Sequence, residues 1–275
     1  MKILGVSLGT KNGNNDTMCR VALEAAKEKG AEIEFIHLLD WDIQYCSGCV
    51  ACSRGLVMGK GMICSRQDDF KAFYEKVVEA DGVLFVDPIF ESGATGLYHS
   101  ITDRMGPGHD TGMMKMLDGK LKEAGKEGLN PRYFRQKALS FVGIGGSDWA
   151  VRCETDHAMF ALSPGWKVVN NEFFSWCKDV IMQDDKVERM KEIGRNLADA
   201  AQQIIDEDMQ IEGSEKTSLW KGKEGACPHC QGNNFYIYPG TTHCVCELCG
   251  LEGTLEIVDG AFKFKYDPAT EHHAH

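Results

Sequence analysis

Cysteine is the residue type whose spacing in this chain points most directly to chemistry. Nine of the twelve cysteines lie in two short stretches, from Cys46 to Cys64 and from Cys227 to Cys249. The N-terminus has neither the apolar core nor the small-residue cleavage site of a signal peptide, so we expect a cytoplasmic protein. In a reducing cytoplasm, such cysteines bind metals or take part in redox chemistry instead of forming disulfides.

The C-terminal group contains two Cys-x2-Cys pairs with fifteen residues between them. This spacing is typical of a four-cysteine zinc site, in which each pair places two thiolates on one side of a tight turn. A segment of about 50 residues has a small core, so a bound ion would supply the missing stability. Cys244 would form a wider pair with Cys249 and is not expected to be a ligand. The predicted ligands are Cys227, Cys230, Cys246 and Cys249, with rubredoxin-type iron as the alternative to zinc.

The N-terminal group has the spacing Cys-x2-Cys-x2-Cys-x11-Cys. Three cysteines at intervals of three can turn their sulfurs toward one point, and a fourth from a flexible loop can complete the ligand set. The pattern favours a [4Fe–4S] cluster, with zinc or free thiols as the alternatives. The predicted cluster ligands are Cys46, Cys49, Cys52 and Cys64.

The elements that must position these residues follow from the hydrophobic pattern. Short apolar or alternating runs predict strands, and a 3.6-residue periodicity predicts helices. Alternating strands and helices predict an α/β fold with a doubly wound parallel sheet. Residues 106–136 interrupt this order and are expected to form an insertion, either a lid or a disordered loop. We expect strands at 2–7, 32–38, 82–86, 138–144 and 167–170, and helices at 18–29, 68–80, 95–105, 151–162 and 184–206.

Composition changes twice along the chain and predicts two domains. Residues 1–206 carry the α/β pattern, and residues 207–224 are polar, as in a linker. Residues 225–275 have short aromatic and β-branched runs between the cysteine pairs, which predicts a small zinc-ribbon domain with a tail.

The charge of the chain excludes some partners. With 30 Lys and Arg against 41 Asp and Glu, the formal net charge is −11. Nucleic acids and anionic membrane surfaces favour a basic face, so we expect neither as a partner. No run of about 18 apolar residues is present, so no transmembrane helix is expected.

Four loops within residues 1–206 carry a family resemblance. They are 7–17, the cysteine loop with Asp68-Asp69-Phe70, 87–95 with Thr102-Asp103-Arg104, and 145–149 with Glu154 beyond. Through them the chain resembles the flavodoxin-like NAD(P)H-dependent FMN reductases and, within them, the iron-sulfur flavoproteins. Three features depart from that pattern. Leu8-Gly9-Thr10-Lys11 stands where Gly-Ser-Pro-Arg is usual, Phe90 replaces a common Tyr, and the gap before Cys64 is longer than usual.

The resemblance implies a flavodoxin-like sheet with FMN at the carboxyl ends of its strands, where open α/β sheets bind ligands. The first loop enters a helix and would hold the phosphate, the second would support the isoalloxazine ring, and the third would meet its pyrimidine side. The residues implied for the phosphate are Ser7, Lys11, Asn12, Asn14, Asn15 and Thr17. Those implied for the ring are Pro88, Ile89, Phe90, Glu91, Ser92 and Gly93, and those for the pyrimidine side are Gly145, Gly146, Ser147, Asp148 and Trp149.

These parts predict an FMN-dependent oxidoreductase. Electrons would come from NAD(P)H or a reduced carrier protein and pass, with the cluster as a relay, to a small, planar, unsaturated or quinone-like acceptor. No side chain is expected to act as a catalytic acid or base, and the isolated His99, His109 and His157 are expected to be structural. Phe90, Tyr98 and Trp149 are expected to flank the acceptor.

The resemblance also implies a homo-oligomer, either a dimer or a tetramer. Two other functions remain open from the sequence. One is a non-enzymatic electron carrier with the same flavin and iron–sulfur cofactors. The other is a zinc-dependent interaction module whose flavin site is vestigial.

Overall fold

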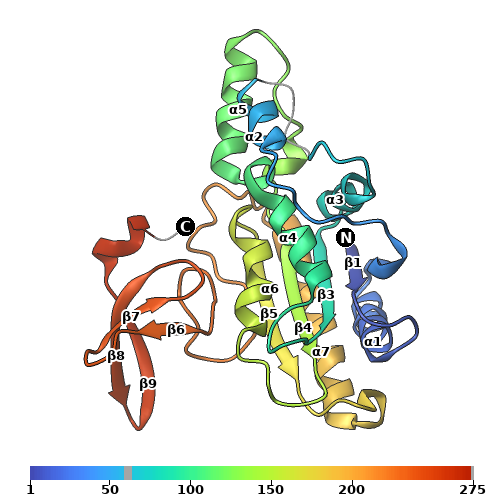
Figure 1. Cartoon of the computed structure of the whole chain (residues 1–275), viewed down its shortest axis with the longest axis vertical. Helices are drawn as coiled ribbons and strands as arrows, with labels where there is room; N and C mark the ends of the chain where they lie inside the picture. The colour runs from blue at the N-terminus through green and yellow to red at the C-terminus, as the bar shows by residue number, and fades with distance from the viewer. Residues whose placement is uncertain (59–63, 274–275) are drawn as a thin grey trace.

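A computed structural model describes residues 1–58 and 64–273 of the chain (Figure 1). Residues 59–63, which lie within the predicted spacing between Cys52 and Cys64, and residues 274–275 of the predicted tail are outside the described residues. The described chain forms a five-stranded sheet with helices on both faces and a four-stranded sheet near the C-terminus.

The five-stranded sheet is parallel throughout. Its strands are β1 (Lys2–Ser7), β2 (Glu32–His37), β3 (Gly82–Pro88), β4 (Ala138–Ile144) and β5 (Lys167–Phe174), in the spatial order β2-β1-β3-β4-β5. This is the flavodoxin-like doubly wound order, so the predicted fold class is confirmed. The order reverses after β1, and the loops that follow β1 and β3 therefore meet at the same edge of the sheet.

Two helices cover one face of this sheet and three cover the other. The first pair is α1 (Asn14–Glu28) and α7 (Asp184–Asp206), and the other three are α3 (Phe70–Glu79), α4 (Gly96–His109) and α6 (Cys153–Leu162). Successive strand residues point to opposite faces, so each strand contributes to both cores. The buried strand residues show this alternation: Ile3, Leu84 and Val86 face α1 and α7, whereas Leu4, Val83 and Phe85 face the other helices.

Two strands are longer than their patterns predict. β3 continues through Pro88, and β5 continues from Asn170 to Phe174. Asn170 and Asn171 are buried, and Asn171 Nδ2 donates to Glu154 O at 2.6 Å. Polar residues interrupt an apolar strand pattern, but here their side chains find partners in the interior and the strand continues.

Residues 106–136 are largely helical, so the expectation of a disordered loop is wrong. After α4 the chain forms α5 (Thr111–Glu123) and the short 3-10 helix η2 (Pro131–Phe134). Asp110 caps α5 by accepting the Met113 N–H at 2.8 Å. α5 packs on α2 (Ala51–Val57), which belongs to the cysteine loop, through a small core that contains Leu56, Met114 and Leu117.

The C-terminal sheet is an antiparallel meander. Its strands are β6 (Phe235–Ile237), β7 (His243–Cys246), β8 (Glu252–Val258) and β9 (Ala261–Tyr266). We call residues 225–266 the C-terminal ribbon. The remaining short 3-10 helices are η1 (Leu38–Asp40), η3 (Val180–Met182) and η4 (Pro268–His273).

The polar segment 207–224 packs along the large sheet. Met209, Ile211 and Leu219 are buried in its two cores. The Lys221 N–H donates to Val169 O at 2.7 Å beside β5. None of the helices in the described part of the chain has the length and apolar composition needed to cross a bilayer.

His109, at the end of α4, gives the fold a dependence on acid. Its side chain is 1% exposed against Tyr74, and neither ring nitrogen has a hydrogen-bond partner among the described residues. Burial lowers the pKa of His109 to about 3. The unfolded chain binds this proton near pH 6.5, so the stability contributed by the neutral ring is complete above about 6.5 and is lost as pH falls toward 3.

From pH 7 to pH 5 we expect the free energy of unfolding to fall in the wild type and to fall less in His109→Leu. Urea denaturation at both pH values measures this difference. At pH 7 the variant should be at least as stable as the wild type, since it removes two buried unsatisfied nitrogens. If the free energy of unfolding falls equally in His109→Leu and in the wild type, His109 is not the group that titrates.

Candidate functional site

The loops that follow β1, β3, β4 and β5 are joined by main-chain hydrogen bonds at one edge of the sheet. Leu8 N–H donates to Val86 O at 3.0 Å, and Ile89 N–H donates to Ile144 O at 3.0 Å. Gly145 N–H donates to a carbonyl at the end of β5, at 2.9 Å. The three loops that the sequence assigns to FMN are therefore neighbours in space.

The loop after β1 folds around the carboxylate of Asp16, in the first turn of α1. Asp16 accepts the Ser7 hydroxyl at 2.5 Å and the Asn12 N–H at 2.7 Å, and it lies 3.0 Å from His37 Nδ1. Burial alone would raise the pKa of Asp16, but these hydrogen bonds lower it below its usual value. Asp16 therefore stays charged and fixes the shape of the loop.

Asn15 and the start of α1 are the groups left for a phosphate. Asn15 is 6% exposed, and its Nδ2 has no hydrogen-bond partner among the described residues. The Thr17 N–H is the first to bond back within the helix, to Gly13 O at 3.0 Å, so the preceding helical N–H groups have no intrahelical partner. Together with the helix dipole, these donors fit a phosphate. The other five residues predicted for the phosphate have partners within the chain: Ser7, Lys11, Asn12, Asn14 and Thr17.

A tight turn at Phe90–Gly93 follows β3. Phe90 and Gly93 exchange two main-chain hydrogen bonds, and both central residues have positive φ, 47° at Glu91 and 66° at Ser92. This is the geometry of a type I′ turn, which Asn and Gly adopt more readily. A Cβ at position 93 would lie 2.3 Å from Asp156 Oδ2, so glycine is required where the turn meets α6. Backbone strain of this kind clusters at functional sites.

Helix α6 holds this turn through its first residues. The Arg152 N–H donates to Ser92 O at 3.0 Å, and Asp156 Oδ2 accepts the Ala94 N–H at 3.0 Å. The position of the turn is therefore set by α6 as well as by β3.

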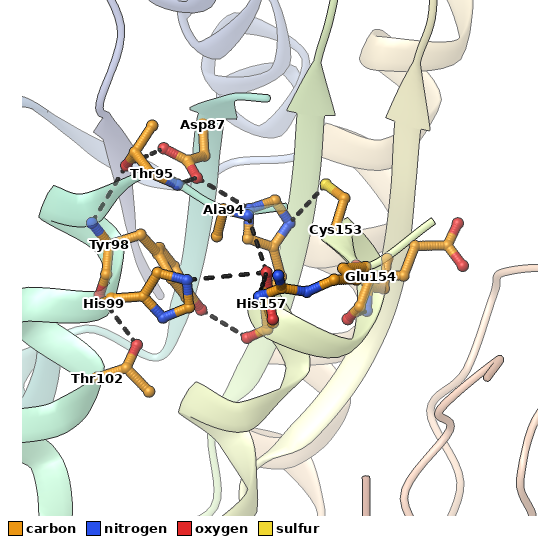
Figure 2. Close-up of polar contacts among 12 residues, drawn as sticks. Asp87, Ala94, Thr95, Tyr98, His99, Thr102, Cys153, Glu154 and His157 are labelled. Atoms are coloured by element: carbon orange, nitrogen blue, oxygen red, sulfur yellow. Dashed lines mark hydrogen bonds and ion pairs between the residues drawn. The ribbon is translucent and has the colours of Figure 1, made fainter. Parts of the chain in front are cut away.

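A buried chain of side chains lies behind the turn (Figure 2). The Asp87 carboxylate accepts the Thr95 N–H at 2.9 Å and the Thr95 hydroxyl at 2.7 Å. Asp87 Oδ2 also lies 3.2 Å from His157 Nε2, and His157 Nδ1 lies 3.6 Å from Cys153 Sγ. The sequence alone shows no partner for His157, and the structure places its ring between Asp87 and Cys153. The i, i+4 spacing of Cys153 and His157 on one helix is the signal that could have linked them.

Three exposed aromatic rings follow β3, β4 and β5. Phe90, Trp149 and Trp176 are 63%, 61% and 62% exposed. No sequence motif contains Trp176, and its φ of 59° is unusual for so large a residue. Tyr98 is fully buried and donates its hydroxyl to His157 O at 2.5 Å, so the expectation that Tyr98 flanks an acceptor is wrong.

The loop after β4 changes from buried to exposed within a few residues. The main chain of Gly145 is bonded on both sides, and its carbonyl accepts the Cys177 N–H at 2.9 Å. Ser147 Oγ accepts the Trp149 N–H at 3.3 Å, whereas Gly146 and Asp148 face outward. An anchored loop with an exposed tip fits the predicted contact with the flavin's pyrimidine side.

A buried ion pair joins the two ends of the cysteine loop. Arg104 binds the Asp68 carboxylate with both terminal nitrogens, and the two side chains are 1% and 0% exposed. Arg104 Nη1 also donates to Gln44 O at 3.0 Å, and the Gln44 N–H donates to Asp68 Oδ2 at 2.9 Å. Residues 44 and 68 are therefore held together at the base of the loop.

The sulfurs of the N-terminal cysteines are not brought together. Cys46 and Cys49 are exposed, and Cys52 and Cys64 are half-buried. Within residues 1–58 and 64–273, they do not form a group of ligand atoms within 4.8 Å of one another. Hydrogen bonds from the Ala51 N–H and from nearby serine hydroxyls lower the pKa of Cys49.

The C-terminal cysteines form a compact group. The four sulfurs lie within 4.8 Å of one another, with 3.7 Å between Cys227 and Cys249 and 3.5 Å between Cys230 and Cys246. A tetrahedral zinc site with bonds of about 2.3 Å has sulfur–sulfur distances of about 3.8 Å, so the group fits such an ion. Cys244 is outside the group, in agreement with its predicted exclusion.

The ribbon packs on the opposite side of α6 from the large sheet (Figure 1). Asn233 Nδ2 donates to Glu154 Oε2 at 2.8 Å, and Asn234 Nδ2 donates to Thr155 Oγ1 at 2.7 Å. Ala158 of α6 lies in one apolar cluster with three of the four clustered cysteines: Cys227, Cys246 and Cys249. α6 therefore links the four-cysteine group to the turn at Phe90–Gly93.

Together, the α1 donors, the strained turn and the anchored loop after β4 fit the phosphate and ring of FMN. The fold and site define a flavodoxin-like flavoprotein with a four-cysteine group that can hold a metal. The model of the NADPH-dependent FMN reductase family matches residues 1–179, and the chain belongs to that family. It is a flavin-dependent oxidoreductase.

The individual relatives include proteins named for flavones and iron-sulfur flavoproteins. A solved structure of a flavone reductase is 40% identical with a TM-score of 0.83, and the match covers 100% of this chain and 84% of that one. The flavone synthase cfoJ of Aspergillus candidus is 27% identical over 98% of this chain and 83% of its own. An iron-sulfur flavoprotein of Archaeoglobus fulgidus is 29% identical over 54% of this chain. That match spans 64% of the relative, less than two thirds of its length.

Proposed function

We propose that the protein takes electrons from NAD(P)H and reduces the conjugated carbon–carbon double bond of a planar, flavone-like enone. The observation that carries this proposal is that three exposed rings, Phe90, Trp149 and Trp176, lie in the loops after β3, β4 and β5, at the edge of the sheet assigned to FMN. Aromatic faces of this kind stack on planar substrates. The likeness to a flavone reductase along the whole chain supports the choice of substrate class.

When bound, FMN supplies the transfer of a hydride from NAD(P)H to the acceptor. The enone gains the hydride at the carbon β to its carbonyl and a proton at the α carbon, while NAD(P)H becomes NAD(P)+. The proton comes from solvent. The chain contributes position: the Phe90–Gly93 turn and the loop 145–149 hold the ring, and the exposed aromatics orient the substrate.

The test is anaerobic turnover of FMN-loaded protein with flavone, a quinone and an azo dye, using NADH and NADPH in turn. We expect saturable NAD(P)H oxidation with flavone and a product that gains two hydrogens by mass spectrometry. Turnover with only the quinone or the azo dye would contradict the flavone-like substrate. No saturable turnover with any acceptor would support the non-enzymatic electron carrier.

Replacement of Trp176 by alanine should raise the KM for flavone about 2- to 13-fold, since an aromatic contact contributes about 0.5–1.5 kcal/mol. The dissociation constant of FMN should not change, because Trp176 is outside the residues assigned to the flavin. Phe262→Ala is the matched control, since Phe262 is a similarly exposed ring on β9. Equal KM values in both variants would contradict a role for Trp176 in substrate binding.

We also propose that the N-terminal cysteines Cys46, Cys49, Cys52 and Cys64 bind a [4Fe–4S] cluster that relays electrons to or from the flavin. The likeness to iron-sulfur flavoproteins and the joined base of the cysteine loop support this proposal. The loop would have to close to gather the four sulfurs. About four irons per chain are expected after anaerobic purification, with loss in Cys49→Ser but not in Ser47→Ala. Iron-free wild-type protein would contradict the cluster.

Zinc is the ion that we propose for the C-terminal four-cysteine group. We further propose a cytoplasmic dimer or tetramer. Residues 1–206 and 225–275 would be two domains in contact, with 207–224 as the segment between them. The ligand type and the sulfur distances support zinc, and the family resemblance supports the oligomer. Metal analysis and analytical ultracentrifugation of the purified protein test these two points.

A further inference from the structure

His157 is a buried ionisable residue for which the proposed reaction has no role. Figure 2 shows its ring between the Asp87 carboxylate and the Cys153 sulfur, which bind its two nitrogens. All three residues are at most 1% exposed. A carboxylate with this degree of burial needs a partner, because an unpaired buried charge is costly.

The carboxylate that His157 binds is also the anchor of the turn. Asp87 holds the Thr95 N–H and hydroxyl, and Thr95 in turn caps α4 by accepting the Tyr98 N–H at 3.2 Å. The turn at Phe90–Gly93 lies between Asp87 and Thr95 in the sequence, so this contact closes the loop that contains it. His157 therefore supports the turn from within the core.

The surroundings of His157 favour its charged form. Burial alone would lower the pKa of His157, but the Cys153 sulfur and the hydrogen bond with Asp87 raise it to about 10. From the other elements, α4 presents the Tyr98 ring at 4.9 Å and β4 presents the Phe141 ring at 6.0 Å. These contacts favour the imidazolium form, in which one ring N–H faces the Asp87 carboxylate and the other faces the Cys153 sulfur.

We propose that His157 is a positioning residue for the flavin reaction. It holds the Phe90–Gly93 turn through Asp87 and Thr95, and its charge favours the reduced form of bound FMN. This inference rests on the proposed FMN site. Reduction adds electrons to the flavin. The charge of His157 offsets that of the Asp87 carboxylate, so its loss would leave an unpaired negative charge behind the turn and disfavour the more negative, reduced state. His157 thus differs from a purely structural residue, because it acts on the balance between the two redox states.

The test compares wild type with His157→Gln, which keeps a side-chain donor for Asp87 but carries no charge. His99→Gln is the matched control, since His99 faces Asp156 beside the same turn, at 3.7 Å, but is well exposed to solvent. We measure the midpoint potential of bound FMN and the dissociation constants of oxidised and reduced FMN. His157→Gln should weaken the binding of reduced FMN about tenfold more than the binding of oxidised FMN. For two electrons this equals a fall of about 30 mV in the midpoint potential. His99→Gln should leave the potential unchanged.

An unchanged potential in FMN-loaded His157→Gln would overturn the role of His157 and leave the proposed function intact. A wild-type protein that does not bind FMN would overturn both. If His157→Gln does not fold, nitrogen-15 NMR of histidine-labelled wild type decides the charge. Two protonated ring nitrogens at pH 8 support the proposal, and a neutral ring overturns it.

Discussion

Substitution of Cys246 by serine should remove the metal from the C-terminal four-cysteine group and weaken FMN binding in the same protein. Cys246 is 1% exposed and lies within 3.5 Å of the Cys230 sulfur. Structural zinc contributes about 10–16 kcal/mol to the folding of such small domains, so the ribbon should lose its order with the ion. The hydrogen bonds of Asn233 and Asn234 to α6 would then be lost.

The flavin effect follows from the position of α6, which holds Ser92 and Ala94 on its other side. We expect an FMN dissociation constant about tenfold higher, a change of about 1.4 kcal/mol, by fluorescence titration. Cys244→Ser is the matched control, because Cys244 is a buried cysteine on the same strand but outside the group. Full metal content in Cys246→Ser would contradict the ligand assignment. Metal loss with unchanged FMN affinity would contradict the link through α6.

Arg104→Leu should lower the free energy of unfolding by about 3–5 kcal/mol, because it leaves the Asp68 carboxylate buried without its cation. The guanidinium also stacks 4.1 Å from the centre of the Phe70 ring and binds Gln44 O. Urea denaturation measures the loss. The variant should also loosen the base of the cysteine loop, so the half-buried Cys52 and Cys64 should react faster with a thiol reagent.

The double variant Arg104→Leu with Asp68→Leu tests the cause. Removal of both charges leaves no unpaired buried ion, so the double variant should be more stable than Arg104→Leu alone. Arg104→Lys keeps the charge but loses the paired hydrogen bonds, and it should fall between wild type and Arg104→Leu. Equal losses in the single and double variants would contradict the account based on the unpaired carboxylate.

The large sheet could be predicted because its signals are local. Strands such as Ala138–Ile144 are continuous apolar runs, and α7 has the periodicity of a helix with one buried side. The C-terminal cysteines could be predicted for the same reason, since two short pairs at fixed spacing describe their geometry almost completely. β5 was predicted too short because its buried asparagines depend on partners elsewhere in the chain.

The interior of the site could not be predicted in this way. Asp87 and His157 are 70 positions apart, and only the packing of α6 against β3 makes them partners. The phosphate loop illustrates a second limit. Its composition identifies a set of polar donors, but Ser7 and Asn12 donate to Asp16. Only the structure shows that Asn15 Nδ2 has no partner among the described residues and can bind a phosphate.

The position of α6 between the ribbon and the large sheet affects how this protein can be recombined. Chimeras that exchange the last fifty or so residues between relatives would place a foreign partner against Glu154, Thr155 and Ala158. A working exchange would have to carry the outward side of α6 along with the ribbon. The two parts of the chain are thus expected to be inherited and engineered as one unit.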